Sequence, residues 1–125
     1  MLASYTSPWM SEDLTIFQDA VKKFYTKEFA PQSDKWTKQG YVDREAWLQA
    51  GEAGILCASI PEEYGGAGGN YAHEAILAEE QERCAVAGFG NIVHSAICAH
   101  YFLSYGTEEQ RQKWLPRMAT GELVC

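Results

Sequence analysis

Apolar residues recur every three or four positions along most of this chain, which is the spacing of amphipathic α-helices. The first such stretch predicts one helix over about 11–29, with the Ser11 hydroxyl at its N-cap and Pro31 ending it. A polar stretch from Gln32 to Gly40 follows, and Asp43 is placed to cap a short second helix.

Two further helices follow in the middle of the chain. Asn70 is placed to cap a helix that runs to about Cys84, with its acidic residues on the solvent side. Gly88-Phe89-Gly90-Asn91 then breaks the chain, and 92–103 is apolar around most of the helical circumference. Such a helix is expected to be buried on nearly every side.

The last helix has a clear start. Thr107 and Gln110 have the spacing of a capping box, and Pro116 is expected to limit or kink the helix they begin. The sequence therefore predicts an all-α bundle of about five helices. We expect residues 1–10 to form an N-terminal tail and residues 11–125 a single domain.

A glycine-rich crossover connects the second and third helices. The apolar run from Ile55 to Ile60 is expected to be buried and extended, and Pro61 with four glycines at 65, 66, 68 and 69 makes the loop. Neither a Gly-x-Gly-x-x-Gly run nor a Gly-Lys-Ser/Thr run is present, and Glu62 and Glu63 lie just upstream. These features favour a tight connection between helices over a phosphate-binding loop.

The charge of the chain limits its partners. Ten basic and seventeen acidic side chains leave a formal net charge of -7, which repels nucleic-acid phosphates and anionic lipid. Between Arg44 and Arg83 there is no Lys or Arg, so this stretch is a poor place to bind a diphosphate. Nucleic acid is therefore an unfavourable partner.

The cysteines indicate the redox compartment of the protein, and one uncharged stretch raises the question of a membrane span. Four cysteines, without a Cys-x-x-Cys pair, favour reduced thiols in a cytosolic-type compartment, and the N-terminus shows neither a secretory nor a transit signal. The stretch from Cys84 to Tyr105 lacks charged residues, yet its Gly, Asn, His and Ser residues make it too polar for a membrane span. A central helix of a soluble bundle fits better.

Three segments carry a resemblance to a known family. Ile60–Gly69, Tyr105–Pro116 and Ala119–Cys125 resemble the N-terminal helical domain of the acyl-CoA dehydrogenases, flavoenzymes that desaturate fatty acyl thioesters. In that family a β-domain follows, with a Thr-Glu-Pro and a Gly-Ser-Asp that contact the flavin, and neither triplet occurs in this chain. We therefore expect a fragment that lacks both the β-domain and the C-terminal helical domain.

The resemblance implies a function for the parent protein. It would remove a proton from the α-carbon of an acyl-CoA and pass a hydride from the β-carbon to FAD, with the catalytic glutamate in the C-terminal domain. No glutamate here matches that base, so the resemblance assigns no catalytic, cofactor-binding or metal residue to this chain. It implies an electron-transfer protein as partner, a homo-oligomer, and a cytoplasmic location, or the mitochondrial matrix in a eukaryote.

The turn before the 92–103 helix is where the resemblance places substrate contacts. In the family this turn and the next two helical turns form the far wall of the fatty-acyl pocket, so Phe89, Gly90, Val93 and Ile97 would line it. The run from Ile92 to Ile97 is similar to an Ile-His-Ser-Gly-Ile run of the long-chain branch, which favours medium to long acyl chains. The alternative is that these residues only pack helix against helix.

These expectations predict the effects of two substitutions. Ile97→Asp is expected to unfold the domain, because a charge in a buried helix costs more than the fold can compensate. Phe89→Ala in a full-length protein is expected to change chain-length preference more than stability.

Other chemistries stay open as less favoured hypotheses. His94 and Cys98 lie one helical turn apart, with Cys84 and His100 near in sequence, so a zinc site or a Cys-His nucleophile pair that could also use His73 is conceivable. A buried cysteine and a hydrogen-bonded histidine explain the same residues. The acids Glu79, Glu80 and Glu82 are expected to form a solvated helix face rather than an acid/base site.

Two other functions remain possible from the sequence. The chain could be a self-contained helical interaction module, or it could belong to a relative that oxidises nitroalkanes or sulfur compounds on the same fold. A piece of a larger enzyme should leave apolar faces uncovered, for example around Tyr101 and Trp114, whereas a self-contained module should not.

Overall fold

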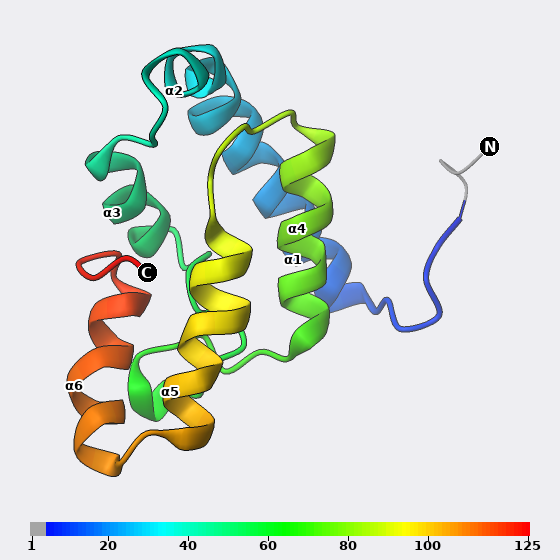
Figure 1. Ribbon diagram of the computed structural model, residues 1–125. Coiled ribbons are helices and arrows are strands. Elements are labelled where there is room, and N and C mark those ends of the chain that lie inside the picture. Colours follow the sequence, from blue (N-terminus) through cyan, green and yellow to red (C-terminus); the bar gives the residue numbers. More distant parts are fainter. Residues whose placement is uncertain (1–4) are drawn as a thin grey trace.

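The computed structural model describes residues 5–125, which fold into helices without a β-strand in that range (Figure 1). The predicted all-α class is confirmed. The expected tail at 1–10 lies partly outside the described residues, and Tyr5 and Trp9 within it are exposed. No helix in the described part of the chain is long and apolar enough to cross a membrane.

The first helix begins as predicted and, with a π-helical turn, reaches the predicted end near residue 29. α1 (Glu12–Phe24) starts at Ser11, whose Oγ accepts a hydrogen bond from the Leu14 backbone N–H at 3.2 Å. A π-helical turn, η2 (Tyr25–Phe29), extends it, and a 3-10 turn, η3 (Ala30–Gln32), leads directly into α2 (Ser33–Gln39).

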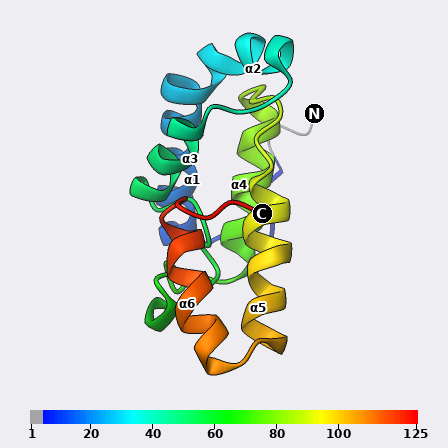
Figure 2. The ribbon, with the colours of Figure 1, turned by 60° about the vertical axis from the view of Figure 1, so that its left-hand side comes forward.

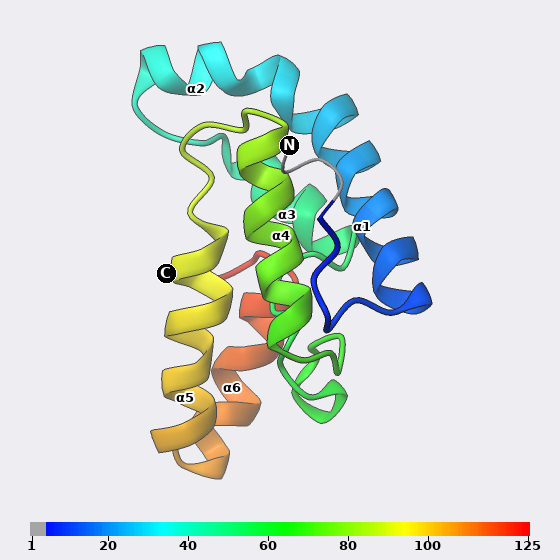
Figure 3. The same cartoon turned by 90° about the vertical axis from the view of Figure 1, so that its right-hand side faces the viewer.

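The predicted helix over about 11–29 agrees with α1 and η2, but the polar stretch from Gln32 to Gly40, for which the sequence predicted no helix, contains α2. Pro31 sits in the first positions of the 3-10 turn, where its missing N–H would have no helical acceptor in any case. The chain therefore turns at the proline and continues as α2, which ends at Gly40 with a φ of 84°. α2 crosses one end of the molecule above α1 and α3 (Figures 1 and 3).

Asp43 precedes α3 (Arg44–Glu52) but does not cap it with its side chain. Its carboxylate instead accepts hydrogen bonds from Lys35 Nζ at 2.6 Å, Gln39 Nε2 at 2.9 Å and Trp36 Nε1 at 3.2 Å. These bonds lower the pKa of Asp43 to about 2, with the Lys35 bond the largest cause. Asp43, predicted to cap α3, therefore links α2 to the start of α3 through its side chain.

The second half of the chain forms three long helical segments. α4 (Tyr71–Arg83) packs beside α1, and η5 (Ile92–Cys98) continues without interruption into α5 (Ala99–Tyr105). α6 (Glu108–Ala119) returns antiparallel beside α5 (Figure 2). Capping boxes at Asn70 with His73 and at Thr107 with Gln110 begin α4 and α6, which confirms both predicted starts.

Two of the acids on α4 are buried, contrary to the prediction of a solvated face. Glu74 Oε1 accepts hydrogen bonds from the Ser59 N–H at 3.0 Å and the Ser59 hydroxyl at 2.9 Å. Glu80 Oε1 accepts bonds from Gln18 Nε2 at 2.8 Å and Arg83 at 3.1 Å. Burial is tolerated because Oε1 of each carboxylate accepts two hydrogen bonds, whereas Glu80 Oε2 has no partner in the described structure.

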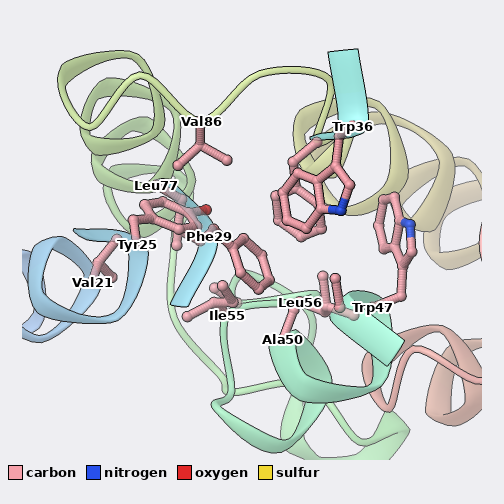
Figure 4. Packing of buried hydrophobic residues seen from close by; sticks show 13 residues of the cluster. Val21, Tyr25, Phe29, Trp36, Trp47, Ala50, Ile55, Leu56, Leu77 and Val86 are labelled. Carbon is pink, nitrogen blue, oxygen red and sulfur yellow. The ribbon is translucent and has the colours of Figure 1, made fainter. Parts of the chain in front are cut away.

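The core consists of two apolar clusters. The larger one joins α1, η2, α2 and α3 to the end of the α4–η5 connection, and its aromatic members pack edge to face around Phe29 (Figure 4). The smaller one lies between the glycine-rich crossover, α5 and α6, with Cys57, Ile60, Tyr64, Ala99, Leu115, Met118 and Ala119 as its buried members. The η5–α5 helix thus contacts the core along one side.

Candidate functional site

The outer side of the η5–α5 helix carries an exposed apolar stripe. Val93, Ile97 and Tyr101 follow one another at four-residue spacing and are 52%, 46% and 65% exposed. Tyr105, one turn further on, is also exposed, and its ring centroid lies 5.9 Å from that of Tyr101. We call these four residues the η5–α5 stripe. The helix that bears it lies at an edge of the molecule (Figure 3).

The prediction that this helix is buried on nearly every side is wrong for the stripe. α4, α6 and the C-terminal segment cover only one side of the helix, so the other side has no neighbouring element in the described part of the chain. The apolar residues that the sequence pattern placed all around the helix are therefore divided between core and surface. A stripe of this kind marks a surface that another element or ligand covers.

The inner side of the η5 part of this helix carries polar side chains that are hydrogen-bonded within the fold. Ser95 Oγ accepts the Cys57 N–H at 2.8 Å and donates to Asn91 Oδ1 at 2.6 Å, and Asn91 Nδ2 donates to the Ile55 carbonyl at 3.1 Å. These bonds attach the helix to the buried 55–58 segment. Because they use the polar groups at the start of η5, the orientation that turns Val93 and Ile97 outward is fixed.

His94 shows how the C-terminal segment is held. Its Nε2 lies 2.9 Å from the Met118 carbonyl, and its Nδ1 lies 3.2 Å from the Cys125 backbone nitrogen. A carbonyl only accepts and a backbone N–H only donates, so the ring is the neutral tautomer with hydrogen on Nε2. Burial lowers the pKa of His94, while the bond to Met118 opposes that shift.

The predicted site residues fall into two groups. Phe89 is 2% exposed and packs against Trp47 and Phe29, with ring centroids 4.6 and 4.9 Å away. Gly90 is exposed, and a Cβ placed on it would meet nothing within 4 Å. Gly90 therefore lies at the open end of the surface that carries Val93 and Ile97, whereas the Phe89 side chain points into the core.

This division reverses the two expectations for substitutions. Phe89 is a core residue, so Phe89→Ala should lower stability strongly, and Ile97 is half exposed, so Ile97→Asp should not unfold the domain. The sequence placed both residues on the same pocket wall. It could not show that the backbone turns between them.

The glycine-rich loop has a structural role. The N–H groups of Gly66, Gly68 and Gly69 donate to the carbonyls of Pro61, Ile60 and Ala58. A Cβ on Gly66 would overlap the Ile60 backbone, so the loop folds tightly on itself. Its donors are used within the chain, which confirms the interpretation as a connection between helices.

The N-termini of α1, α4 and α6 are unfavourable places for a diphosphate such as that of FAD. Side chains of Ser11, Asn70 and Thr107 cap α1, α4 and α6, and acidic residues occupy the first turns of all three helices. The acids oppose an anion at the positive end of the helix dipole. These three N-termini therefore do not fit the phosphates of FAD.

The three histidines are each engaged in the fold. His73 Nδ1 accepts the Asn70 N–H at 3.1 Å, and His100 Nε2 lies 2.7 Å from Ser59 Oγ. No group of three or more metal-ligating side chains is found among residues 5–125. The hydrogen-bonded interpretation of these histidines is thus the one that the geometry supports.

Comparison with known proteins agrees with the fold. The family model described as acyl-CoA dehydrogenase, N-terminal domain, matches residues 11–122. The chain belongs to the acyl-CoA dehydrogenase family. The long-chain specific acyl-CoA dehydrogenase, mitochondrial, of Mus musculus is 39% identical over 114 residues, which are 91% of this chain and 26% of that protein.

Solved structures of acyl-CoA dehydrogenases share the arrangement of the helices. One from Geobacillus kaustophilus has a TM-score of 0.88 and 39% identity over 95% of this chain and 31% of its own. Another, from Bacillus anthracis and complexed with FAD, has a TM-score of 0.83 and 31% identity over 96% of this chain and 21% of its own. The chain thus spans about a quarter of the curated relative and corresponds to the N-terminal domain of the family.

The extension of the stripe to Tyr101 and Tyr105 was not part of the predicted site. The signal was present as continued four-residue spacing from Val93 and Ile97. Tyr101 was expected only as an uncovered apolar residue, and that expectation is confirmed. Trp114, named with it, is partly buried, with its ring 6.5 Å from that of Phe102.

Proposed function

We propose that the protein carrying this domain is a flavin-dependent acyl-CoA dehydrogenase, and that Gly90, Val93 and Ile97 form part of its acyl-pocket wall. The observation that carries the proposal is the apolar η5–α5 stripe, which the domain itself leaves uncovered. The Phe89 side chain packs on Trp47 in the core and so holds in place the turn that contains Gly90.

The chemistry of the proposed reaction lies outside this domain. FAD would accept the hydride from the β-carbon, and the N-termini of α1, α4 and α6 do not fit its phosphates. What this domain supplies is an apolar surface against the acyl tail, which excludes water from the reacting carbons. A β-domain and a C-terminal helical domain would hold the cofactor and the catalytic base.

The open end of the stripe favours medium to long acyl chains. Gly90 adds no side chain at this point, and its hypothetical Cβ has free space around it. A longer chain therefore has room to pass beside the turn before it meets Val93. The similarity to a long-chain specific relative supports the same preference.

The partners and location follow from this proposal. An enzyme of this kind takes fatty acyl-CoA, hands its electrons to an electron-transfer protein and forms a homo-oligomer. It would act in the cytoplasm, or in the mitochondrial matrix if the source is eukaryotic, as the mitochondrial name of the relative indicates.

The test is anaerobic titration of the purified whole protein with palmitoyl-CoA. The proposal predicts loss of the visible absorption of oxidised flavin and formation of the α,β-enoyl thioester, while the isolated 125-residue chain stays colourless. A whole protein that binds no flavin would contradict the proposal and favour the interaction module. Flavin that is reduced by a nitroalkane but not by any acyl-CoA would favour the nitroalkane-oxidising relative.

A further inference from the structure

The η5 part of the η5–α5 helix has π-helical and not α-helical geometry. It spans seven residues, Ile92–Cys98, and at its end the Ala99 backbone N–H donates to the His94 carbonyl, five residues back. π-helical turns are rare, occur mostly as single turns within α-helices, and are frequent at functional sites. This segment contains Val93 and Ile97, two residues of the proposed acyl-pocket wall.

The π geometry keeps the η5–α5 stripe on one side of the helix. An α-helix turns by about 100° per residue, so side chains at four-residue spacing move about 40° around it at every step. In a π turn the hydrogen bonds span five residues instead of four, so a four-residue step falls short of a full turn instead of exceeding it. Val93 and Ile97 therefore stay in line with Tyr101, and all three side chains are exposed.

Ser95 lies in the middle of the π segment and attaches it to the core. Its side chain is completely buried, and its Oγ accepts the Cys57 N–H at 2.8 Å and donates to Asn91 Oδ1 at 2.6 Å. Asn91 Nδ2 in turn donates to the Ile55 carbonyl at 3.1 Å. A rotation of Ser95 away from the core would leave the buried Cys57 N–H without an acceptor, which opposes any change in the geometry of η5.

We propose that Ser95 is a positioning residue that holds η5 in its π-helical geometry, aligns Val93 with Ile97 and thereby sets the preference for long acyl chains. The selectivity part of this inference rests on the proposed function, because it concerns the same pocket wall. Ser95 acts through η5 and not by contact with the acyl chain, since its side chain is buried on the inner side of the helix.

Loss of the Ser95 hydroxyl should change the geometry of η5. Ser95→Ala removes the acceptor of the Cys57 N–H and the donor to Asn91, so η5 is free to adopt the commoner α-helical hydrogen bonds. That change rotates Ile97 relative to Val93. A palmitoyl chain is long enough to contact both side chains, whereas a butyryl chain is not, so the preference for the longer substrate should fall.

Ser33→Ala is the matched control for Ser95→Ala. Ser33 is also buried, and its Oγ also accepts a backbone N–H from a distant segment, that of Ala87 at 3.2 Å. Ser33 lies on α2, and its bond reaches the connection before Phe89, whose own ring packs in the core. Loss of this hydroxyl should therefore lower stability without changing the geometry of η5.

The first measurement identifies the acceptor of the Ala99 N–H in the 125-residue chain, from the NMR scalar coupling across the hydrogen bond. In the unchanged chain and in Ser33→Ala, the Ala99 nitrogen should couple to the His94 carbonyl carbon. In Ser95→Ala it should couple to the carbonyl carbon of position 95. Coupling to position 95 in the unchanged chain, or coupling to His94 in all three chains, would overturn the role of Ser95.

The second measurement uses the whole protein and the ratio of kcat/KM for palmitoyl-CoA to that for butyryl-CoA. Ser95→Ala should lower this ratio at least about threefold, and Ser33→Ala should leave it unchanged. Equal ratios in all three proteins, or an equal loss in both variants, would overturn the selectivity role. A whole protein that no acyl-CoA reduces would contradict the proposed function itself, whereas the NMR couplings need no flavin and decide separately whether Ser95 holds η5.

Discussion

The inner and outer sides of the η5–α5 helix differ in what their residues contact. On the inner side, His94 and Ser95 are completely buried and bonded to the C-terminal segment and the 55–58 segment. On the outer side, Val93 and Ile97 are about half exposed and lie on the side without a neighbouring element in the described structure. In the η5 part of the helix these polar residues face inward and these apolar residues face outward, the reverse of an ordinary surface helix, whereas Ala99 of α5 is buried in the smaller apolar cluster.

This inversion separates stability from binding within one helix. The buried polar groups fix the position of the helix through specific hydrogen bonds. The outward apolar groups remain free to contact a ligand or another part of the protein outside the described residues. Phe89, just before the helix, belongs with the inner side. Substitutions on the two sides should therefore have different consequences.

The largest expected effect is on the inner side. Phe89→Ala removes a ring that packs on Trp47 and Phe29 and should lower the free energy of unfolding by about 3–5 kcal/mol. Urea unfolding followed by tryptophan fluorescence measures it. A loss below about 1 kcal/mol would mean that the turn carries Phe89 on its surface.

The C-terminal segment, which the inner side holds, should be almost as sensitive. Gly121 has a φ of 76°, and a Cβ there would overlap the Trp47 carbonyl, so Gly121→Ala should cost about 2–4 kcal/mol. Gly40→Ala is the matched control, because Gly40 has a φ of 84° and open space around it. Equal unfolding midpoints for the two variants would contradict the close approach of the segment to α3.

The outer side should tolerate a charge. Ile97→Asp is expected to change the free energy of unfolding of the isolated chain by less than about 1 kcal/mol, because the introduced carboxylate would remain in water. The same urea series measures it beside Phe89→Ala. A loss as large as that of Phe89→Ala would place Ile97 in the core and remove the contrast between the two sides.

The smallest expected effect is at Asp43, which lies outside the η5–α5 helix and links α2 to the start of α3 through its hydrogen bonds. The pKa of Asp43 is lowered from 3.8 to about 2, so the stability it contributes is present above pH 3.8 and is lost as the pH falls toward 2. Asp43→Asn should therefore unfold at lower urea than the unchanged chain at pH 6, and the difference should shrink near pH 2. A difference independent of pH would exclude the ionised carboxylate as its cause.

The local signals in the sequence were sufficient for most helix starts but not for α2. Ser11, Asn70 and Thr107 cap their helices as their residue types predict, because a cap is a local hydrogen bond. α2 was missed because Pro31 is a helix breaker in the interior of a helix and a good first residue of a new turn. Only the fold decides between these two roles.

The candidate site could be predicted in part. The break at Gly88-Phe89-Gly90-Asn91 and the apolar spacing of the next helix located the region, and the family resemblance supplied the function to test. Which residues face outward depends on long-range bonds, such as those from His94 to Met118 and from Ser95 to Cys57. Such bonds join residues 24 and 38 positions apart and leave no periodic signal in the sequence.

The most direct test of the central claim compares two tryptophan substitutions in the whole protein. Ile97→Trp fills space on the η5–α5 stripe, and Ile16→Trp makes the same change at an exposed isoleucine of α1. The measured quantity is the ratio of kcat/KM for palmitoyl-CoA to that for butyryl-CoA. We predict that Ile97→Trp lowers this ratio at least about tenfold and that Ile16→Trp leaves it unchanged. An unchanged ratio in Ile97→Trp would contradict the claim that the stripe lines the acyl pocket.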